Sequence, residues 1–228
     1  MSPFDQSRDG GGKVVMFGTG SLSSMLQLYL AEDSDYEVVA FTATADHLTG
    51  DSFSGLPLVP FERVTDSHPP SEHRMFIAVG YDHMNRLRSR FYREAKSLGY
   101  ELITYVSSRA HFRAAAVGDN CCVFEGAIVE PFTTIGNDVI VWGGAHVSHH
   151  SAVGDHSFLA PGATIAGHTS VGSHCFLGIN ATVGDGVSIG DDCLIGAGAN
   201  IVGDVGPRQV LLGARARRDP RDVDRFFR

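Results

Sequence analysis

The second part of the chain carries an aliphatic residue at every sixth position, and this spacing limits the possible folds more than any other feature. A period of six is neither that of an α-helix, about 3.6 residues, nor the two-residue alternation of a flat strand. The residue four places further on is small or β-branched each time. The aliphatic positions are Val117, Val123, Val129, Ile135, Val141, Val147, Val153, Leu159, Ile165, Val171, Leu177, Val183, Ile189, Ile195 and Ile201.

A slower repeat of glycines shows how the six-residue units are grouped. Each of these glycines opens a Gly-Asp, Gly-Asn or Gly-Ser turn, and they recur every 18 residues at Gly118, Gly136, Gly154, Gly172 and Gly190. Three units therefore make one three-sided coil, which is the signature of a hexapeptide β-helix. We expect the aliphatic residues to point inward, the small residues to fill the narrow interior, and the glycines to supply turn conformations that a Cβ would oppose. The pattern predicts a parallel β-helix over residues 111–206, followed by a C-terminal tail at 207–228.

Residues 13–110 alternate short apolar runs with helical patterns. The apolar runs predict strands at residues 13–17, 36–42, 75–80 and 101–106. Helical spacing appears after the first and third runs, with inward residues at Leu22, Met25, Leu26 and Tyr29, and at Leu87, Phe91, Ala95 and Leu98. The outer face of the second helix carries Arg86, Arg88, Arg90, Arg93 and Lys96. Strands separated by helices predict a Rossmann-like α/β domain with a small parallel sheet, preceded by a disordered leader at 1–12.

Composition excludes several classes of protein. A net charge of −8 and a pI near 5.7 argue against a nucleic-acid-binding protein, which would present a basic surface. The four cysteines form no CxxC pair, so they indicate neither a zinc site nor a disulfide framework. Cys121, Cys175 and Cys193 fall at the inward small positions, and we interpret them as core residues. With no long apolar run and no signal-peptide pattern, we expect a soluble cytoplasmic protein.

Histidines gather in residues 146–156, which read HVSHHSAVGDH. Residues 18 apart lie one above another on neighbouring coils, about 4.8 Å apart, so we expect His150 near His168 and His156 near His174. We interpret His156, His168 and His174 as turn histidines at the surface. A metal site within one chain is disfavoured, because each stacked pair lacks a third ligand and residues six apart lie on different sides of the coil. We therefore predict no metal cofactor.

With these features together, the sequence resembles the bacterial sugar acyltransferases that join a Rossmann-like domain to a left-handed β-helix. That family includes nucleotide-linked 4-amino-sugar N-acetyltransferases and sialic acid O-acetyltransferases. The resemblance runs from the FGTG turn at 17–20 through the repeats to the GARAR stretch at 213–217. It implies a homotrimer, with acetyl-CoA in the groove between neighbouring β-helices and the nucleotide-linked sugar under the N-terminal domain.

The resemblance also implies a histidine general base in the stretch VSHHSAVG at 147–154, where His149 matches the base. Relatives carry an acidic residue at the next position, which is His150 in this chain. A carboxylate would raise the pKa of the base and hold its tautomer, whereas a second imidazole provides orientation. We predict His149 and His150 as catalytic residues, with the base either weaker than in relatives or supported by a carboxylate from elsewhere.

Acetyl-CoA contacts are implied at glycines and small residues that we expect on successive coils below His149, and in the loop after the last coil. That loop lacks the proline that relatives carry near the pantetheine. The implied positions are Gly167, Gly178, Ile179, Ala197, Gly213, Ala214 and Arg215. Arg217 and Arg218 are candidates for contact with the CoA phosphates, with a solvated tail as the alternative.

The turn FGTGSLSS at 17–24 joins a strand to a helix N-terminus, where backbone N–H groups and the helix dipole favour a phosphate. It matches an NAD fingerprint poorly, because Ser23 replaces the third glycine and the second strand ends in FTAT rather than an acidic residue. A nucleotide-sugar diphosphate fits better. Another strand ends nearby in IAVGYD, so we predict substrate contacts at Gly18, Thr19, Gly20, Gly80 and Tyr81.

Together with the resemblance, these observations predict an acetyl-CoA-dependent N-acetyltransferase that acts on the 4-amino group of a nucleotide-linked amino-dideoxy sugar. Three alternatives stay open at this point. One is a sugar O-acetyltransferase, since the same base would serve a hydroxyl. Another is a zinc enzyme of the carbonic anhydrase type with ligands from two subunits, and the third is a binding protein that has lost catalysis.

Overall fold

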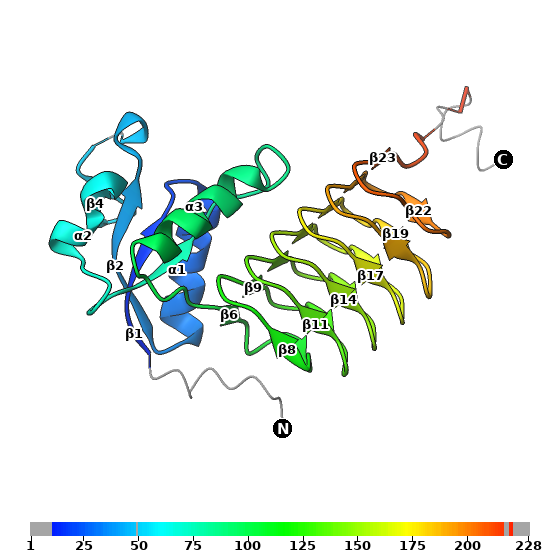
Figure 1. Cartoon of the computed structure of the whole chain (residues 1–228), viewed down its shortest axis with the longest axis horizontal. Helices are drawn as coiled ribbons and strands as arrows, with labels where there is room; N and C mark the ends of the chain where they lie inside the picture. The colour runs from blue at the N-terminus through cyan, green and yellow to red at the C-terminus, as the bar shows by residue number, and fades with distance from the viewer. Residues whose placement is uncertain (1–10, 49, 217–218, 221–228) are drawn as a thin grey trace.

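The computed structural model describes residues 11–48, 50–216 and 219–220. The chain divides into an α/β unit and a long stack of three-sided coils (Figure 1). Arg217 and Arg218, and most of the predicted leader, lie outside the described residues. The α/β unit contains β1 (Gly12–Phe17), α1 (Ser21–Asp33), β2 (Tyr36–Ala43), η2 (Ala45–His47), β3 (Ser52–Phe53), β4 (Leu56–Pro60), η3 (Phe61–Arg63), α2 (Val64–Ser67), β5 (Arg74–Ile77) and α3 (Arg86–Ser97). Among the described residues, no helix has the length and apolar character needed to cross a bilayer.

The sheet of the α/β unit runs in the order β3-β4-β2-β1-β5. Strands β1, β2, β4 and β5 are parallel, as the βαβ pattern predicts, while β3 pairs antiparallel with β4 at the edge. The sheet is therefore mixed rather than purely parallel. Leu26 of α1 packs on one face of the sheet, and Phe91 of α3 packs on the other.

The stack of coils is a left-handed β-helix with three parallel sheets. The seven-stranded sheet contains β6 (Tyr105–Val106), β9 (Cys122–Val123), β12 (Ile140–Val141), β15 (Phe158–Leu159), β18 (Phe176–Leu177), β21 (Leu194–Ile195) and β23 (Val210–Leu211). The six-stranded sheet contains β7 (His111–Phe112), β10 (Ile128–Val129), β13 (His146–Val147), β16 (Thr164–Ile165), β19 (Thr182–Val183) and β22 (Asn200–Ile201). The five-stranded sheet contains β8 (Ala116–Val117), β11 (Thr134–Ile135), β14 (Ala152–Val153), β17 (Ser170–Val171) and β20 (Ser188–Ile189).

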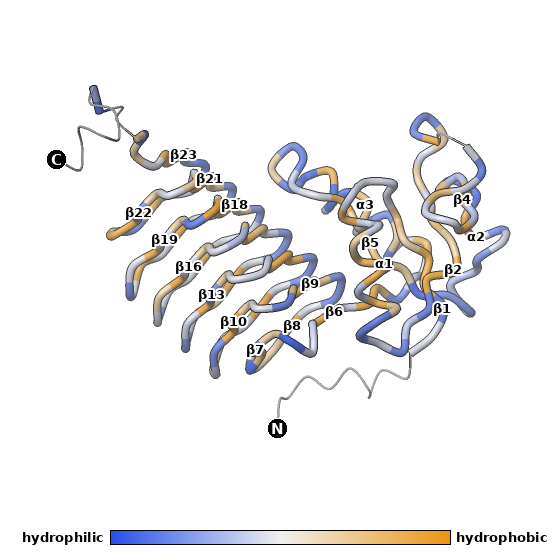
Figure 2. Tube along the Cα trace, turned by 180° about the vertical axis from the view of Figure 1, so that it is seen from behind, coloured by the Kyte–Doolittle hydropathy of each residue, from blue (hydrophilic) through white to orange (hydrophobic). Residues whose placement is uncertain are grey.

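The interior of the β-helix confirms the six-residue reading. Val147 pairs with Ile165 on the next coil, so residues 18 apart are vertical neighbours. The aliphatic and small positions form one buried cluster, which includes Cys121, Cys175 and Cys193. Burial raises the pKa of the Cys121 thiol to about 12, so this sulfur is a core atom and not a thiolate nucleophile. Figure 2 shows apolar residues along the strands and hydrophilic residues at many of the turns.

The β-helix begins earlier than its period indicated. Residues 101–106 were expected to form a strand in the sheet of the α/β unit. Only Leu102 bridges to that sheet, at Met75. Tyr105–Val106 instead pairs with Cys122–Val123 of the coil. The inward residues Val106, Phe112 and Val117 are spaced by six and then five positions, so counting back from Val117 in sixes misses this first coil.

The glycines that open the turns serve a different purpose from the one predicted. Gly154 does not adopt a left-handed conformation, but a Cβ there would lie 2.6 Å from the carbonyl carbon of Gly172 on the next coil. Close stacking of the coils therefore requires glycine at this position. The left-handed conformation falls two residues later, at Asn120, Asp138, His156, His174 and Asp192, with φ between 53° and 61°.

The turns of the β-helix form three edges, which we name by their contents. The histidine edge joins the six-stranded to the five-stranded sheet and includes residues 148–151. The docking edge joins the five-stranded to the seven-stranded sheet and includes residues 154–157. The glycine edge joins the seven-stranded to the six-stranded sheet and includes residues 160–163.

The α/β unit covers part of the seven-stranded sheet and of the docking edge. One apolar cluster contains Leu26 and Phe41 of the α/β unit together with Ile140 and Phe158 of the β-helix. In a three-sided coil, the histidine edge is the vertex opposite the seven-stranded sheet. The histidine edge therefore lies away from the α/β unit of its own chain.

Candidate active site

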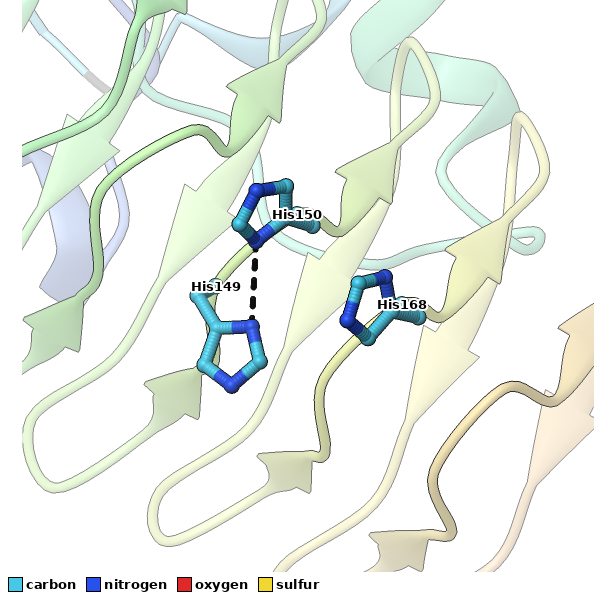
Figure 3. Close-up of side chains that lie close together, drawn as sticks. All are labelled: His149, His150 and His168. Carbon is cyan, nitrogen blue, oxygen red and sulfur yellow. Dashed lines mark hydrogen bonds between the residues drawn. The ribbon is translucent and has the colours of Figure 1, made fainter.

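His149 and His150 lie side by side on the histidine edge, and both are exposed. Their Nδ1 atoms are 3.1 Å apart, so one ring donates a hydrogen bond to the other (Figure 3). The Nε2 atom of His149 faces Gly167, where a Cβ would come within 3.1 Å of it. The described residues make no hydrogen bond to this nitrogen, so it is available to accept a proton when His149 donates its Nδ1–H to His150.

Backbone conformation distinguishes His149 from four other histidines in the turns of the β-helix. His150, His156, His168 and His174 all have positive φ, between 55° and 61°. Histidine is among the residues enriched in this left-handed region, so the turn itself explains why histidines occupy these four positions. His149 has no such conformational reason to be histidine, which makes it the strongest candidate for chemistry.

Glu130 supplies the carboxylate nearest to the main chain of His149. One of its oxygens accepts the backbone N–H of His149 at 2.9 Å, and the other lies 3.1 Å from Nε2 of His146. These two contacts, the His149 N–H first, hold the pKa of Glu130 below its usual value. Glu130 therefore positions the turn that carries His149, while the partner of the His149 ring itself is His150.

The predicted stacking of histidines is confirmed, with one correction to the argument about metals. His150 stacks on His168 with ring centroids 4.9 Å apart, and His156 lies 4.8 Å from His174. The expectation that each pair lacks a third ligand is wrong for the first pair. His149 lies beside it, and one ring nitrogen from each of these three residues lies within 4.8 Å of the others.

The interpretation of His156 as a solvated turn residue is also wrong. Its side chain is mostly buried on the docking edge, with Nδ1 2.8 Å from the carboxylate of Asp138. Arg88, which the helical pattern placed on an outer face, pairs with the same carboxylate. These residues attach the α/β unit to the β-helix.

The implied acetyl-CoA positions divide between two edges. Gly167 lies on the histidine edge, directly next to His149. Gly178, Ile179 and Ala197 lie on the glycine edge instead, so the expectation that they stack below His149 is wrong. A Cβ on Gly178 would meet the backbone N of Ala197 at 2.6 Å, and one on Gly213 would meet the Ala197 carbonyl oxygen at 2.4 Å.

The small residues form a strip with few projecting side chains along the glycine edge. Gly178, Ala197 and Gly213 stack closely, while Ile179 is about half exposed at 54%. Ala214 and Arg215 follow Gly213 and are exposed. Within one chain, this strip and His149 lie on different vertices of the coil.

A cavity of about 390 Å³ lies at the carboxyl ends of β1 and β2 in the α/β unit. Its lining includes Gly18 and Thr19, as predicted, and the N-terminus of α1 follows at Gly20. Gly18 has a φ of 118°, and a Cβ there would lie 2.8 Å from the carbonyl oxygen of Ala78, so only glycine fits this turn. The position matches the usual ligand site of an open α/β sheet.

Four lining residues of this cavity were not found from the sequence: Asp46, His47, Glu62 and Arg90. Asp46 stands in η2, just beyond the strand end where an acidic residue was sought. Asp46 could have been found from the sequence because it lies two residues after Thr44, which also lines the cavity. Glu62 and Arg90 come from η3 and α3, which only the tertiary structure brings to this place.

Comparisons with known proteins agree with this architecture. The family model for the bacterial transferase hexapeptide (six repeats) matches residues 132–167, and that for the hexapeptide repeat of succinyl-transferase matches residues 168–202. No curated protein matches the chain by sequence.

Solved structures match over almost the whole chain. A variant of perosamine N-acetyltransferase from Caulobacter crescentus, in complex with CoA and GDP-perosamine, is 28% identical with a TM-score of 0.78, covering 91% of this chain and 98% of that one. The acetyltransferase domain of PglB from Neisseria gonorrhoeae FA1090, in complex with acetyl coenzyme A, is 25% identical with a TM-score of 0.78 and coverages of 90% and 97%. PerB from Caulobacter crescentus, in complex with CoA and GDP-perosamine, is 29% identical with a TM-score of 0.77 and coverages of 89% and 94%.

The chain is a hexapeptide-repeat acyltransferase. The predicted resemblance to the bacterial sugar acyltransferases with a left-handed β-helix is thereby confirmed.

In this acyltransferase, two of the predicted substrate positions lie away from the lining of the cavity. The carbonyl oxygen of Gly80 accepts a hydrogen bond from Arg88, and Tyr81 packs against Phe158 and Phe176 of the β-helix. Both residues belong to the loop that crosses from β5 to α3. The structure thus brings Gly18 and Thr19 together at the cavity, with Gly20 at its edge, and directs Gly80 and Tyr81 toward the β-helix.

Proposed function

We propose that this acyltransferase transfers the acetyl group of acetyl-CoA to the 4-amino group of a nucleotide-linked amino-dideoxy sugar, with His149 as general base. The observation that carries the proposal is the match over nearly the full chain to structures solved with CoA and GDP-perosamine. Two of the similar structures, both of the Caulobacter crescentus perosamine N-acetyltransferase, carry asparagine or alanine in place of one histidine. An exposed histidine with a free Nε2 beside a glycine is the arrangement that the reaction needs.

The reaction forms one C–N bond and breaks one C–S bond. The amine nitrogen attacks the thioester carbonyl carbon, and the tetrahedral intermediate then expels the CoA thiolate. The amine must lose one proton, which Nε2 of His149 accepts and which can then pass to the thiolate. General-base help of this kind contributes about 10² to 10⁴ in rate.

His150 takes the orienting role in this proposal. A hydrogen bond between the two Nδ1 atoms fixes the plane of the His149 ring, with Nε2 pointing toward Gly167. Glu130 holds the His149 backbone from the previous coil. The His150 ring thus orients the base directly, while the Glu130 carboxylate acts through the main chain.

We further propose that the active site is shared between copies of the chain in a homotrimer. His149 lies on the vertex opposite the sheet that its own α/β unit covers, and the glycine edge lies on a third vertex. A groove between two β-helices would place His149 and Gly167 of one copy against Gly178, Ile179 and Ala197 of another. Acetyl-CoA would occupy this groove, with Gly213, Ala214 and Arg215 at its end.

The cavity of the α/β unit is the proposed site of the nucleotide. Its position at the N-terminus of α1 suits a diphosphate, which the backbone N–H groups around Gly18, Thr19 and Gly20 would bind. Gly80 and Tyr81 would then border the path of the sugar toward the β-helix. The four free cysteines fit a reducing cytoplasm as the compartment.

The proposal is tested by incubating the full chain with acetyl-CoA and a panel of nucleotide-linked sugars that carry either a 4-amino or a 4-hydroxyl group. We expect acetylation of an amino sugar, and a drop of about a hundredfold or more in turnover for His149→Ala with little change in acetyl-CoA binding. His111→Ala, at an exposed histidine of the first coil, is the control. Turnover of wild-type magnitude in His149→Ala would remove the base, and transfer only to hydroxyl sugars would favour the O-acetyltransferase.

Subunit sharing has its own test. Thr19→Trp, which fills the nucleotide cavity, and His149→Ala should each be inactive alone. If the two variants are co-expressed and co-assemble, some sites combine an intact cavity with an intact base, so activity should return. A co-assembled but inactive mixture would place both residues of each site in one chain.

A further inference from the structure

Three histidines on the histidine edge form one cluster. One ring nitrogen from each of His149, His150 and His168 lies within 4.8 Å of the others, and all three side chains are exposed. Figure 3 shows the three rings grouped together, two from one turn and the third from the turn of the next coil. Each imidazole offers one ligand atom, so the cluster has the three nitrogen donors of an open metal site.

The backbone fixes these rings in advance. His150 and His168 hold the same left-handed conformation, with φ of 57° and 55°, on successive coils of a rigid rod. Their rings stack at 4.9 Å, and Phe132 stacks on the other face of His150 at 4.7 Å. His149 meets His168 edge-on at 5.3 Å. Little conformational freedom remains to be lost when a ligand binds, which favours affinity.

We propose that His149, His150 and His168 bind a divalent transition metal ion of the zinc type. This binding inhibits acyl transfer, because a metal on Nδ1 of His149 keeps the ring proton on Nε2, the nitrogen that would accept the proton of the amine. Zinc binds imidazole nitrogen at about 2.0–2.1 Å in a tetrahedral arrangement, which places two donor nitrogens about 3.3 Å apart. The Nδ1 atoms of His149 and His150 are already 3.1 Å apart. A small rotation of the His168 ring completes the set, and water takes the fourth position.

Metal binding changes the ring nitrogen that carries one of the protons of the histidine pair. In the metal-free chain, the hydrogen bond between the two Nδ1 atoms contains one proton, which must move to Nε2 of the same ring before both Nδ1 atoms can coordinate as neutral imidazoles. The metal then holds the His149 ring in place of that hydrogen bond. The metal-binding half of the inference stands on geometry alone, whereas the inhibition half rests on the proposed role of His149 as general base.

The test uses the full metal-free chain and two matched variants. His168→Asn removes the third ligand but keeps a residue that tolerates the left-handed turn. His174→Asn makes the same change in a stacked pair on the docking edge, His156 and His174, which is not part of the three-histidine cluster. Co²⁺ binding is followed by its visible absorption and Zn²⁺ binding by calorimetry. Activity is followed by loss of the thioester, because released thiols themselves bind zinc.

We expect wild-type protein and His174→Asn to bind one ion per chain, and His168→Asn to bind about tenfold more weakly or worse. The Zn²⁺ concentration that halves turnover, with each variant compared to its own metal-free rate, should rise by a similar factor in His168→Asn. Absence of Co²⁺ and Zn²⁺ binding by the wild type, or equal affinity in His168→Asn, would overturn the site. Binding as expected without inhibition would overturn the regulatory half. If no acetyl transfer is found with any acceptor, the proposed function fails while the Co²⁺ titration still decides the metal site.

Discussion

Arg88 of α3 and Asp138 of the β-helix form an ion pair in which neither side chain is exposed to solvent, with Nε and Oδ1 3.0 Å apart. The guanidinium also donates to the carbonyl oxygens of Asp138 and His156. Asp138 accepts a further hydrogen bond from Asn120 and contacts the His156 ring. Both charges are therefore fully partnered in the interface between the α/β unit and the β-helix.

Removing one partner of this pair should be costly. Arg88→Met leaves the Asp138 carboxylate buried with fewer partners, and we expect a loss of about 3–5 kcal/mol in the free energy of unfolding. Urea unfolding measures this, with Arg63→Ala as control, since Arg63 and Asp66 form an exposed pair that contributes about 1 kcal/mol or less. Equal, small losses in both variants would contradict the importance of the buried pair.

A side chain at position 167 should disturb catalysis more than stability. In Gly167→Ala the new Cβ would lie 2.7 Å from Cε1 of His149, and the exposed His149 ring can move while the backbone stays in place. Because misplacing the base by about 1 Å costs up to 10²-fold in rate, we expect turnover to fall by about tenfold or more with nearly unchanged unfolding. Gly203→Ala is the control, since a Cβ there meets nothing within 4 Å. Unchanged turnover in Gly167→Ala would separate this glycine from the active site.

Arg90 should contribute to binding of the nucleotide sugar. It lines the cavity of the α/β unit, and its charge suits a diphosphate. We expect Arg90→Ala to raise the KM for the nucleotide sugar by about tenfold while kcat changes little, as for a residue that binds ground state and transition state alike. Arg93, on the same helix but outside the lining, provides the matched variant Arg93→Ala. A similar KM in both variants would place the nucleotide elsewhere.

Stability should fall in mild acid because of His174. Burial lowers the pKa of His174 below its usual 6.5, and the nearby His156 and Arg86 lower it further. The unfolded chain therefore takes up a proton near pH 6.5, which the folded chain resists, so folding is destabilised as the pH falls from about 6.5 through the lower folded pKa. Nδ1 of His174 is buried without a hydrogen-bond partner, in keeping with a neutral ring.

The measurement is the free energy of unfolding between about pH 5 and 8 for the wild type and His174→Asn. Asparagine tolerates the left-handed turn, so the comparison isolates the titration. We expect a shallower acid loss in His174→Asn than in the wild type, and no such change in His111→Gln, which alters an exposed histidine. Parallel curves for wild type and His174→Asn would show that another group controls the acid side.

Much of the fold follows from local patterns. The short apolar runs located β1, β2 and β5 close to their observed bounds, and the 3.6-residue spacing located α1 and α3. The six-residue period identified the inward residues of the β-helix and the vertical neighbours 18 positions apart, including the stacking of His150 on His168. Missed elements have physical reasons: a five-residue side hid the first coil, and β4, the strand next to the edge strand β3, contains Pro57 and Pro60.

The sequence by itself determined what lies inside each coil and what lies above it, because a fixed period sets both the inward direction and the vertical neighbour. Only the tertiary structure decided which residues on the outside of the β-helix are covered by another part of the chain. Arg88 and His156 look like surface residues from their spacing, yet they are buried because the α/β unit docks on that side. In the same way, only the tertiary structure shows that Ile179 and Ala197 lie on a different edge of the β-helix from His149. Contacts between elements far apart in the chain depend on how two faces pack together, and no repeat within either face encodes that choice.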